Sequence, residues 1–393
     1  MPLDVVKARN ETPGCTKVLH FNNAGASLLP LPVIDAVNGY FRLEIEAGGY
    51  EAADMAKKNL DQFYDSAAKL IGCTRQEIAY FESATRAWDM VFYSLSFKPG
   101  DRILTSKAEY ASSYIAFLQV AKRTGVKVEA VPNDEHGQLA VSELEKMIDS
   151  RVKLIAVAHI PTQGGLVNPA AAIGKVAKAH GIFYLLDATQ SVGQMPIDVE
   201  AIHCDALCTT GRKYLRGPRG TGFLYIRKSK IEQLEPAVLD LQSARWTSLD
   251  QYTMSKDATR FETWERNYAN VLGLKAAIEY AYSWGLENIW EKIGKLSSEL
   301  RAKLGSIPGV MVRDMGKQLC GIVTFTVEGI TAEEVSLKLR EKGIHTSVSL
   351  VEYARLDLEE RHLTSLVRAS VHYYNTEEEI DLFCKEVARL VAR

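Results

Sequence analysis

Short apolar runs alternate with amphipathic segments between about residues 61 and 228. The runs are continuously apolar rather than alternating, which predicts strands that are buried on both faces. We expect six such strands, at 102–105, 127–131, 152–158, 183–186, 206–209 and 222–226. The amphipathic segments predict helices at 112–124, 140–149 and 170–180. Regular strand–helix succession indicates an α/β fold with a mostly parallel sheet and helices on both faces.

The pattern changes after about residue 250. Apolar residues spaced three and four apart predict two long helices, and a mixture of strands and helices follows. The expected helices are 268–284, 286–304, 331–342 and 376–393, and the expected strands are 321–327 and 368–371. Thr376 is a plausible N-cap of the last helix. We therefore predict an N-terminal segment 1–20, a large domain 21–265, and linking helices with a smaller α+β domain at 266–393.

Composition narrows the class of protein. The 393 residues carry a net charge of −2, so no basic surplus favours nucleic acid as a partner. The apolar runs are far shorter than the ~20 residues that a membrane helix needs, and the first residues do not resemble a signal peptide. The six cysteines form no CxxC pair or metal-binding spacing, which predicts no metal and favours reduced thiols in the cytoplasm.

Two charged residues follow successive predicted strands. Asp187 comes directly after 183–186, and Lys213 follows 206–209. In an open parallel sheet, ligands bind beyond the carboxyl ends of the strands, so both side chains can reach one ligand. Pyridoxal 5′-phosphate (PLP) requires a lysine for its Schiff base, an acid at its pyridine nitrogen and a phosphate cradle. We therefore predict a PLP enzyme in which Lys213 also transfers protons at the substrate Cα.

The segments 183–199 and 206–226 resemble the cofactor region of the class V aminotransferase and cysteine desulfurase family, a group of fold-type I PLP enzymes. The resemblance extends to FNNAGASLLP, FESATRAWD and LVRASVHYYNTEEEID, and so covers nearly the whole chain. It implies that Gln190 bonds the phenolic oxygen of the cofactor. It further implies phosphate contacts from Ser83, Ala84, Thr85, Thr210 and Arg212.

The same resemblance suggests substrate residues. Arg368 matches the arginine that forks onto the substrate α-carboxylate, and a guanidinium suits that planar group. Tyr110 is the candidate for stacking on the ring, with Ala111 as the alternative alignment. The segment at the substrate mouth corresponds to Asn23, Ala24 and Gly25, and His159 is a further candidate at a strand end.

The loop 260–266 lies where family members reach the partner's site in a homodimer. Its polar candidates are Glu262, Thr263 and Arg266. The resemblance therefore implies a homodimer in which this loop approaches the partner's cofactor.

The reaction is harder to predict, because PLP activates every bond at Cα. Family desulfurases carry a cysteine in the loop that matches 345–350, and this chain has none there. We therefore expect that it is not a cysteine desulfurase. The turn at 212–220 is similar to that of C–S lyases, which favours β-elimination from a cysteine S-conjugate.

Other reactions stay open. An aminotransferase and an amino-acid epimerase, similar to isopenicillin N epimerase, are the alternatives within the class. A non-catalytic PLP-binding regulator has no appended DNA-binding segment to support it. A dehydrogenase is disfavoured because no G-x-G-x-x-G follows the first strand.

Overall fold

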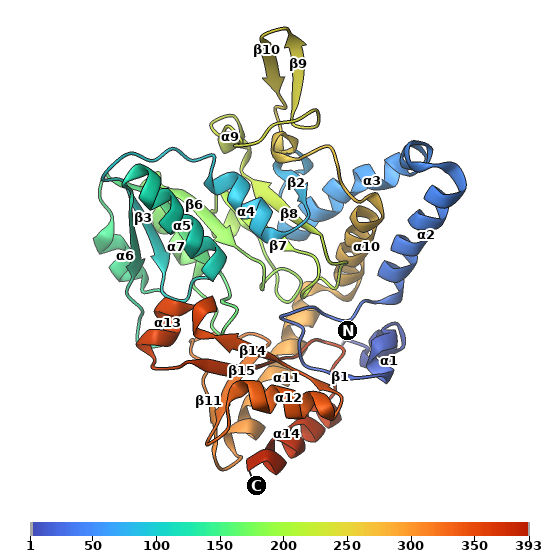
Figure 1. Cartoon of the computed structure of the whole chain (residues 1–393), viewed down its shortest axis with the longest axis vertical. Coiled ribbons are helices and arrows are strands. Elements are labelled where there is room, and N and C mark those ends of the chain that lie inside the picture. Colours follow the sequence, from blue (N-terminus) through green and yellow to red (C-terminus); the bar gives the residue numbers. More distant parts are fainter. Residues whose placement is uncertain (1–2, 392–393) are drawn as a thin grey trace.

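The computed structural model describes residues 3–391, and its largest element is a seven-stranded sheet (Figure 1). The strand order is β2-β8-β7-β6-β5-β3-β4. The strands are β2 (Ile78–Phe81), β3 (Arg102–Ser106), β4 (Lys127–Val131), β5 (Val152–Ala158), β6 (Phe183–Asp187), β7 (Ala206–Thr210) and β8 (Gly222–Ile226). β8 runs opposite to the other six strands of this sheet, so its pairs with β2 and β7 are antiparallel and all other pairs are parallel. The predicted α/β fold is confirmed.

Both faces of this sheet are covered, as the continuous apolar runs predicted. Along β5, Ile155 and Val157 belong to one core cluster, with Ile173 of α7 (Ala170–Ala179). The intervening Leu154 and Ala156 belong to a second cluster. That second cluster includes side chains of α4 (Ala84–Phe92) and α5 (Ala111–Thr124). Alternate side chains of one strand thus anchor helices on opposite faces.

A second sheet of four strands, in the order β11-β12-β15-β14, lies in the C-terminal part. Its strands are β11 (Val310–Val312), β12 (Ile322–Val327), β14 (Ser347–Leu350) and β15 (Ser365–Ser370). The accompanying helices are α11 (Leu286–Gly305), α12 (Ala332–Glu341), α13 (Arg355–Glu360) and α14 (Glu377–Val391), whereas α10 (Tyr268–Trp284) lies against the large sheet's side of the molecule. The Glu379 amide donates to Thr376 Oγ1 over 3.2 Å, so Thr376 caps α14 as predicted. Residues 392–393 of the predicted helix lie outside the described range.

The N-terminal segment joins the two sheets. It contains α1 (Val5–Asn10) and β1 (Leu19–His20), which pairs in parallel with β13 (Ile344–His345). The pair α2 (Leu31–Ala47) and α3 (Gly49–Ile71), which the sequence analysis missed, packs against α10. The division into segments 1–20, 21–265 and 266–393 stays a prediction.

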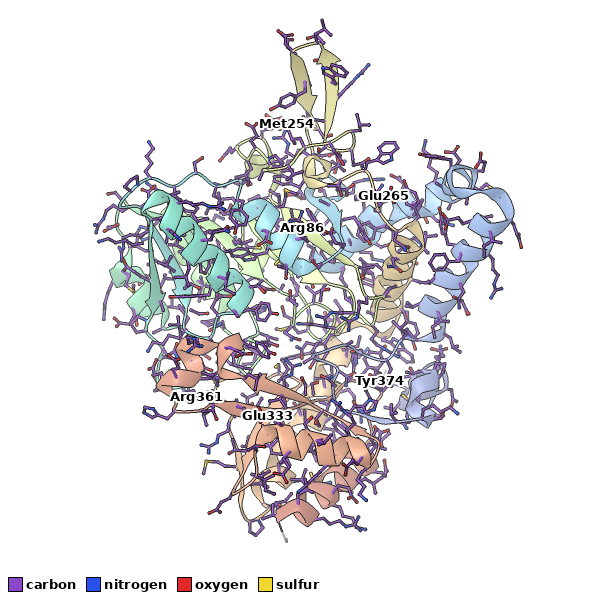
Figure 2. All side chains as sticks on the ribbon, in the orientation of Figure 1. Arg86, Met254, Glu265, Glu333, Arg361 and Tyr374 are labelled. Carbon is purple, nitrogen blue, oxygen red and sulfur yellow. The ribbon has the colours of Figure 1, made fainter. Side chains whose placement is uncertain are left out.

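Another unpredicted element is a hairpin of β9 (Ala244–Ser248) and β10 (Gln251–Met254), which projects from the top of the molecule in Figure 1. Met254, at the base of this hairpin, is labelled in Figure 2. None of the helices within residues 3–391 is long and apolar enough to span a membrane.

Candidate active site

A cavity of about 350 Å³ lies at the carboxyl ends of the parallel strands. Ala158, Asp187 and Thr210 line it from the ends of β5, β6 and β7. All residues that were predicted to hold the cofactor line this cavity. They are Ser83, Ala84, Thr85, Tyr110, Asp187, Gln190, Thr210, Arg212 and Lys213. Strands and turns far apart in sequence therefore converge at one site, as expected for the edge of a parallel sheet.

Lys213 is buried in a positively charged environment. Burial, together with the nearby charges of Arg212 and Arg368, lowers the pKa of its amine to about 7. A primary amine with this pKa is largely neutral slightly above pH 7, and only the neutral form is a nucleophile. The environment of Lys213 therefore suits covalent attachment to an aldehyde.

Asp187 is half-buried and lies beside a buried acid, Glu109, that the sequence analysis missed. Asp187 Oδ1 accepts a hydrogen bond of 2.8 Å from the Thr189 amide. Glu109 is fully buried, and burial raises the pKa of its carboxyl to about 8, with a further contribution from Asp187. The Ala158 and Tyr110 amides donate to Glu109. Glu109 thus ties the end of β5 to the segment that carries Tyr110.

Thr162 is a second residue that the sequence analysis missed. Its hydroxyl accepts from Gln190 Nε2 at 3.2 Å and from Arg368 Nη1 at 2.6 Å. Arg368 also donates to the Thr162 carbonyl at 3.0 Å, while Arg368 Nε has no hydrogen-bond partner among the described residues. Burial lowers the pKa of Arg368 to about 10. A buried guanidinium with an unused donor is suited to a carboxylate ligand.

The predicted substrate-mouth segment lies behind the cavity wall rather than in it. The Asn23 side chain is buried and donates to the Ser370 carbonyl at 2.7 Å. The Ala24 carbonyl accepts from Gln190, and the Gly25 carbonyl accepts from Arg212. These three residues therefore support cavity residues, and their contact with substrate stays a prediction.

His159 follows β5 but is not part of the cavity wall. It is buried, burial lowers its pKa to about 4, and its Nδ1 has no partner within the described residues. Its contact with cofactor or substrate also stays a prediction.

The start of α4 forms one end of the cavity. Ser83 caps this helix by accepting from the Arg86 amide at 3.2 Å, and Arg86 is labelled in Figure 2. Gly222 lies so close that a Cβ there would stand 3.4 Å from the Ala84 nitrogen and 2.3 Å from the Thr209 carbonyl. Unpaired amides at a helix start attract anions, and Arg212 and Arg219 add positive charge at this cavity. The residues present therefore fit a phosphate group.

The loop 260–266 is largely bound to its own chain. Glu262 is buried and accepts from Tyr64 Oη at 2.8 Å, from the Tyr80 amide at 2.7 Å and from Arg266 at 2.9 Å. Thr263 is exposed. The contact of this loop with a partner stays a prediction.

A buried amine of low pKa, a carboxylate on the adjacent strand and an anion-binding helix start define a PLP-dependent enzyme of fold type I. The chain belongs to the family described as Aminotransferase class-V, which it matches over residues 19–383. Its cofactor is pyridoxal 5′-phosphate.

Relatives share this architecture over their full length. A probable cysteine desulfurase of Methanothermobacter thermautotrophicus is 32% identical over 95% of both chains. The apo structure of a cysteine desulfurase from Thermococcus onnurineus NA1 superposes with a TM-score of 0.92 at 29% identity, covering 100% of this chain and 99% of that one. A PLP-containing structure of the cystine C–S lyase C-DES has a TM-score of 0.87 at 24% identity, covering 97% and 98%, which shows the fold alone.

These comparisons correct the prediction about the reaction. We predicted a C–S lyase that acts on a cysteine S-conjugate, and we excluded a cysteine desulfurase. Both predictions were wrong, because full-length relatives are named cysteine desulfurases. The prediction gave too much weight to the missing thiol at 345–350. Binding of cofactor and amino acid depends on residues elsewhere, so one position in that segment does not decide the class.

Proposed function

We propose that this chain removes sulfur from L-cysteine in a PLP-dependent reaction. The observation that carries the proposal is the buried Lys213 amine, with its pKa lowered to about 7, in one cavity with Asp187 and Gln190. The names of the full-length relatives support cysteine as the substrate.

Each cofactor residue has a role in this proposal. When bound, PLP supplies an electron sink for the electron pair released at the substrate Cα. Asp187 would hold the proton on the pyridine nitrogen. Gln190 Nε2 donates to the Ala24 carbonyl and to Thr162, so it would exchange one of these two bonds for a bond to the phenolic oxygen. Lys213 would be the residue that holds the cofactor covalently, and its Nζ, once free, would move the proton at the substrate Cα. Tyr110, at the cavity wall, covers one face of the ring.

The substrate carboxylate is assigned to Arg368. Arg368 lies behind the cavity wall, where its Nη1 donates twice to the lining residue Thr162 and its buried Nε has no partner among the described residues. Thr162 Oγ1 accepts from both Arg368 and Gln190, so its own proton is free to donate into the cavity. Thr162 therefore positions the amino acid relative to the cofactor.

The sulfur atom requires a thiol acceptor. The residues that line the cavity, all within 3–391, include no cysteine. Burial raises the pKa of Cys15 to about 11 and of Cys320 and Cys384 to about 12, so these thiols are protonated and weakly nucleophilic at neutral pH. We therefore propose an added small thiol as acceptor. Cysteine and RSH give alanine and RSSH, so atoms balance and no oxidant is needed.

A homodimer in the cytoplasm completes the proposal. Large apolar side chains are exposed on α2 and α3 and on the β9–β10 hairpin, including Ile45, Tyr50, Trp246 and Leu249. A second copy would bury such residues. The exposure of Thr263 supports a contact between the loop 260–266 and that copy. A monomeric species with full activity in sedimentation at assay concentration would refute the dimer.

The decisive experiment incubates the PLP-loaded protein with L-cysteine and dithiothreitol, and measures alanine and sulfide. Alanine and sulfide in equal amounts, absent in a Lys213→Ala variant, are expected. Pyruvate and ammonia in place of alanine would show elimination and contradict the proposal. A 2-oxo acid that forms only with an amino acceptor would show transamination.

A further inference from the structure

We propose that Arg219 is the arginine that binds the cofactor phosphate, whereas Arg212 holds the N-terminal segment against the cavity. The resemblance assigns the phosphate to Arg212, and nothing in the sequence pattern singles out Arg219. The assignment rests on the cofactor placement proposed above, in which the phosphate lies at the start of α4.

Arg212 already has a partner. Its Nη1 donates to the Gly25 carbonyl, and its own carbonyl accepts from the Ser27 amide at 2.9 Å. Both bonds fasten the segment that includes Ala24, whose carbonyl accepts from Gln190. The guanidinium of Arg212 is thus used to dock this segment behind the cofactor residues.

Arg219 is placed differently. It lines the cavity together with Ser83, Ala84 and Thr85, and its side chain is exposed. Its carbonyl accepts from Asn270 Nδ2 at 3.2 Å, but its guanidinium forms no ion pair or hydrogen bond with another residue in 3–391. A free guanidinium beside a helix start can donate two parallel hydrogen bonds to a phosphate.

The turn that carries Arg219 is rigid. The Gly217 amide donates to the Gly211 carbonyl at 2.8 Å, and the Gly211 amide donates to the Thr221 carbonyl at 2.9 Å. Gly220 has φ of +78°, which favours glycine directly after Arg219. The backbone of Arg219 is therefore fixed at the cavity while its side chain stays free to reach an anion.

Electrostatics supports an anion bound at Arg219. Burial lowers the pKa of Arg212, and the charge of Arg219 lowers it further, so the two guanidinium groups are close enough to repel each other. A phosphate dianion would relieve that repulsion. It would also offset the positive field that Arg212 and Arg368 exert on Lys213.

The test separates phosphate binding from general cofactor binding. Apoprotein variants Arg219→Gln and Arg212→Gln are titrated with PLP and with pyridoxal, which lacks the phosphate, and Kd is read from protein fluorescence. Arg219→Gln should raise Kd for PLP by about 10- to 100-fold, since a hydrogen bond to a charged group contributes ~1.5–3 kcal/mol, and leave Kd for pyridoxal unchanged. Arg212→Gln should weaken both ligands by a similar factor.

Arg86→Gln is the matched control. Arg86 is an exposed arginine in the first turn of the same helix, but it pairs with Glu82 at 3.3 Å, so its loss should change neither Kd more than about twofold. An unchanged PLP-to-pyridoxal ratio in Arg219→Gln, or a phosphate-specific loss in Arg212→Gln, would overturn the assignment. Failure of the unaltered protein to bind PLP would overturn the cofactor placement as well. Melting temperatures of all variants check that each is folded.

Discussion

Two buried arginines, Arg216 and Arg368, have opposite surroundings. Arg216 donates to the Leu28 carbonyl at 2.9 Å, to Tyr373 Oη at 2.7 Å and to Thr12 Oγ1 at 2.5 Å. Its guanidinium also lies 4.5 Å from the ring centroid of Tyr374, which is labelled beside α1 in Figure 2. Arg368, by contrast, bonds only Thr162 among the described residues.

The difference separates a structural cation from a ligand-binding one. Burial alone would lower the pKa of Arg216, but Tyr373 and Tyr374 raise it above its usual value. Burial lowers the pKa of Arg368 to about 10, because no anion or ring compensates enough. A buried charge without a compensating partner lowers the stability of the fold. Such a charge is typical of a binding site for an anionic ligand. Burial alone therefore does not distinguish a structural arginine from a ligand-binding one, whereas the number of its hydrogen-bond partners does.

The largest effect should come from a third buried basic side chain, Lys213. Lys213→Ala should lower turnover by at least about 10³-fold, because both the covalent and the proton-transfer roles are lost. Borohydride reduction followed by peptide mass spectrometry should find the cofactor on Lys213 in the unaltered protein. An adduct on a different lysine would contradict the site. Lys228→Ala, a change at an exposed lysine, serves as the control.

Arg368→Met should lower kcat/KM for cysteine by about 10- to 1000-fold, since a charge-assisted pair of hydrogen bonds to the carboxylate is lost. Arg368→Lys should also be impaired, because an ammonium cannot fork onto two oxygens. The comparison of cysteine with cysteamine, which lacks the carboxylate, measures this effect. If the unaltered protein has the same kcat/KM for both compounds, Arg368 does not bind the substrate carboxylate.

Arg216→Met should affect stability instead. Three buried acceptors lose their donor, so the free energy of unfolding should fall by about 2–4 kcal/mol. KM for cysteine should stay within about twofold of its original value. Urea unfolding and steady-state kinetics check both parts, and Arg368→Met in parallel should lose no stability. Equal destabilisation of the two variants would remove the distinction between these arginines.

Much of the fold was predictable because strand burial leaves a local signal. The bounds of β4, β5 and β8 matched the apolar runs at 127–131, 152–158 and 222–226. Helix α3 left a weaker signal, because its buried stripe consists largely of small residues such as Ala52, Ala56 and Ala67. Packing against α10, α2 and β2 makes that stripe part of a core, and such contacts cannot be read from local periodicity.

The residues of the candidate site also fall into two groups, those that the sequence located and those that only the folded chain identifies. The positions of Asp187 and Lys213 follow from strand ends, so the sequence located them correctly at one cavity. Thr162 matters because it meets Arg368, a residue 206 positions away in the chain. The free state of Arg219 depends on which neighbours already have partners. Neither feature has a sequence motif, so these two residues can be recognised only in the folded chain.

A pH dependence of stability tests the two arginines through Lys213, and the shift of its onset is the smallest effect expected. In the apoprotein the pKa of Lys213 is about 7, against an ordinary value of 10.5. Between these values the unfolded chain binds a proton that the folded chain does not, so stability should rise with pH by up to about 1.4 kcal/mol per unit from this group. Lys213→Met should lack that contribution, and the difference from the unaltered protein isolates it. Urea unfolding at pH 7.5, 8.5 and 9.5 gives the slopes.

Arg368 lowers the pKa of Lys213, and Arg216 does not contribute to it. Arg368→Met should therefore move the onset of the rise to higher pH, while Arg216→Met leaves it unchanged. Identical pH profiles for the unaltered protein and Lys213→Met would show that the amine is charged in the folded state, and the nucleophile assignment would fail.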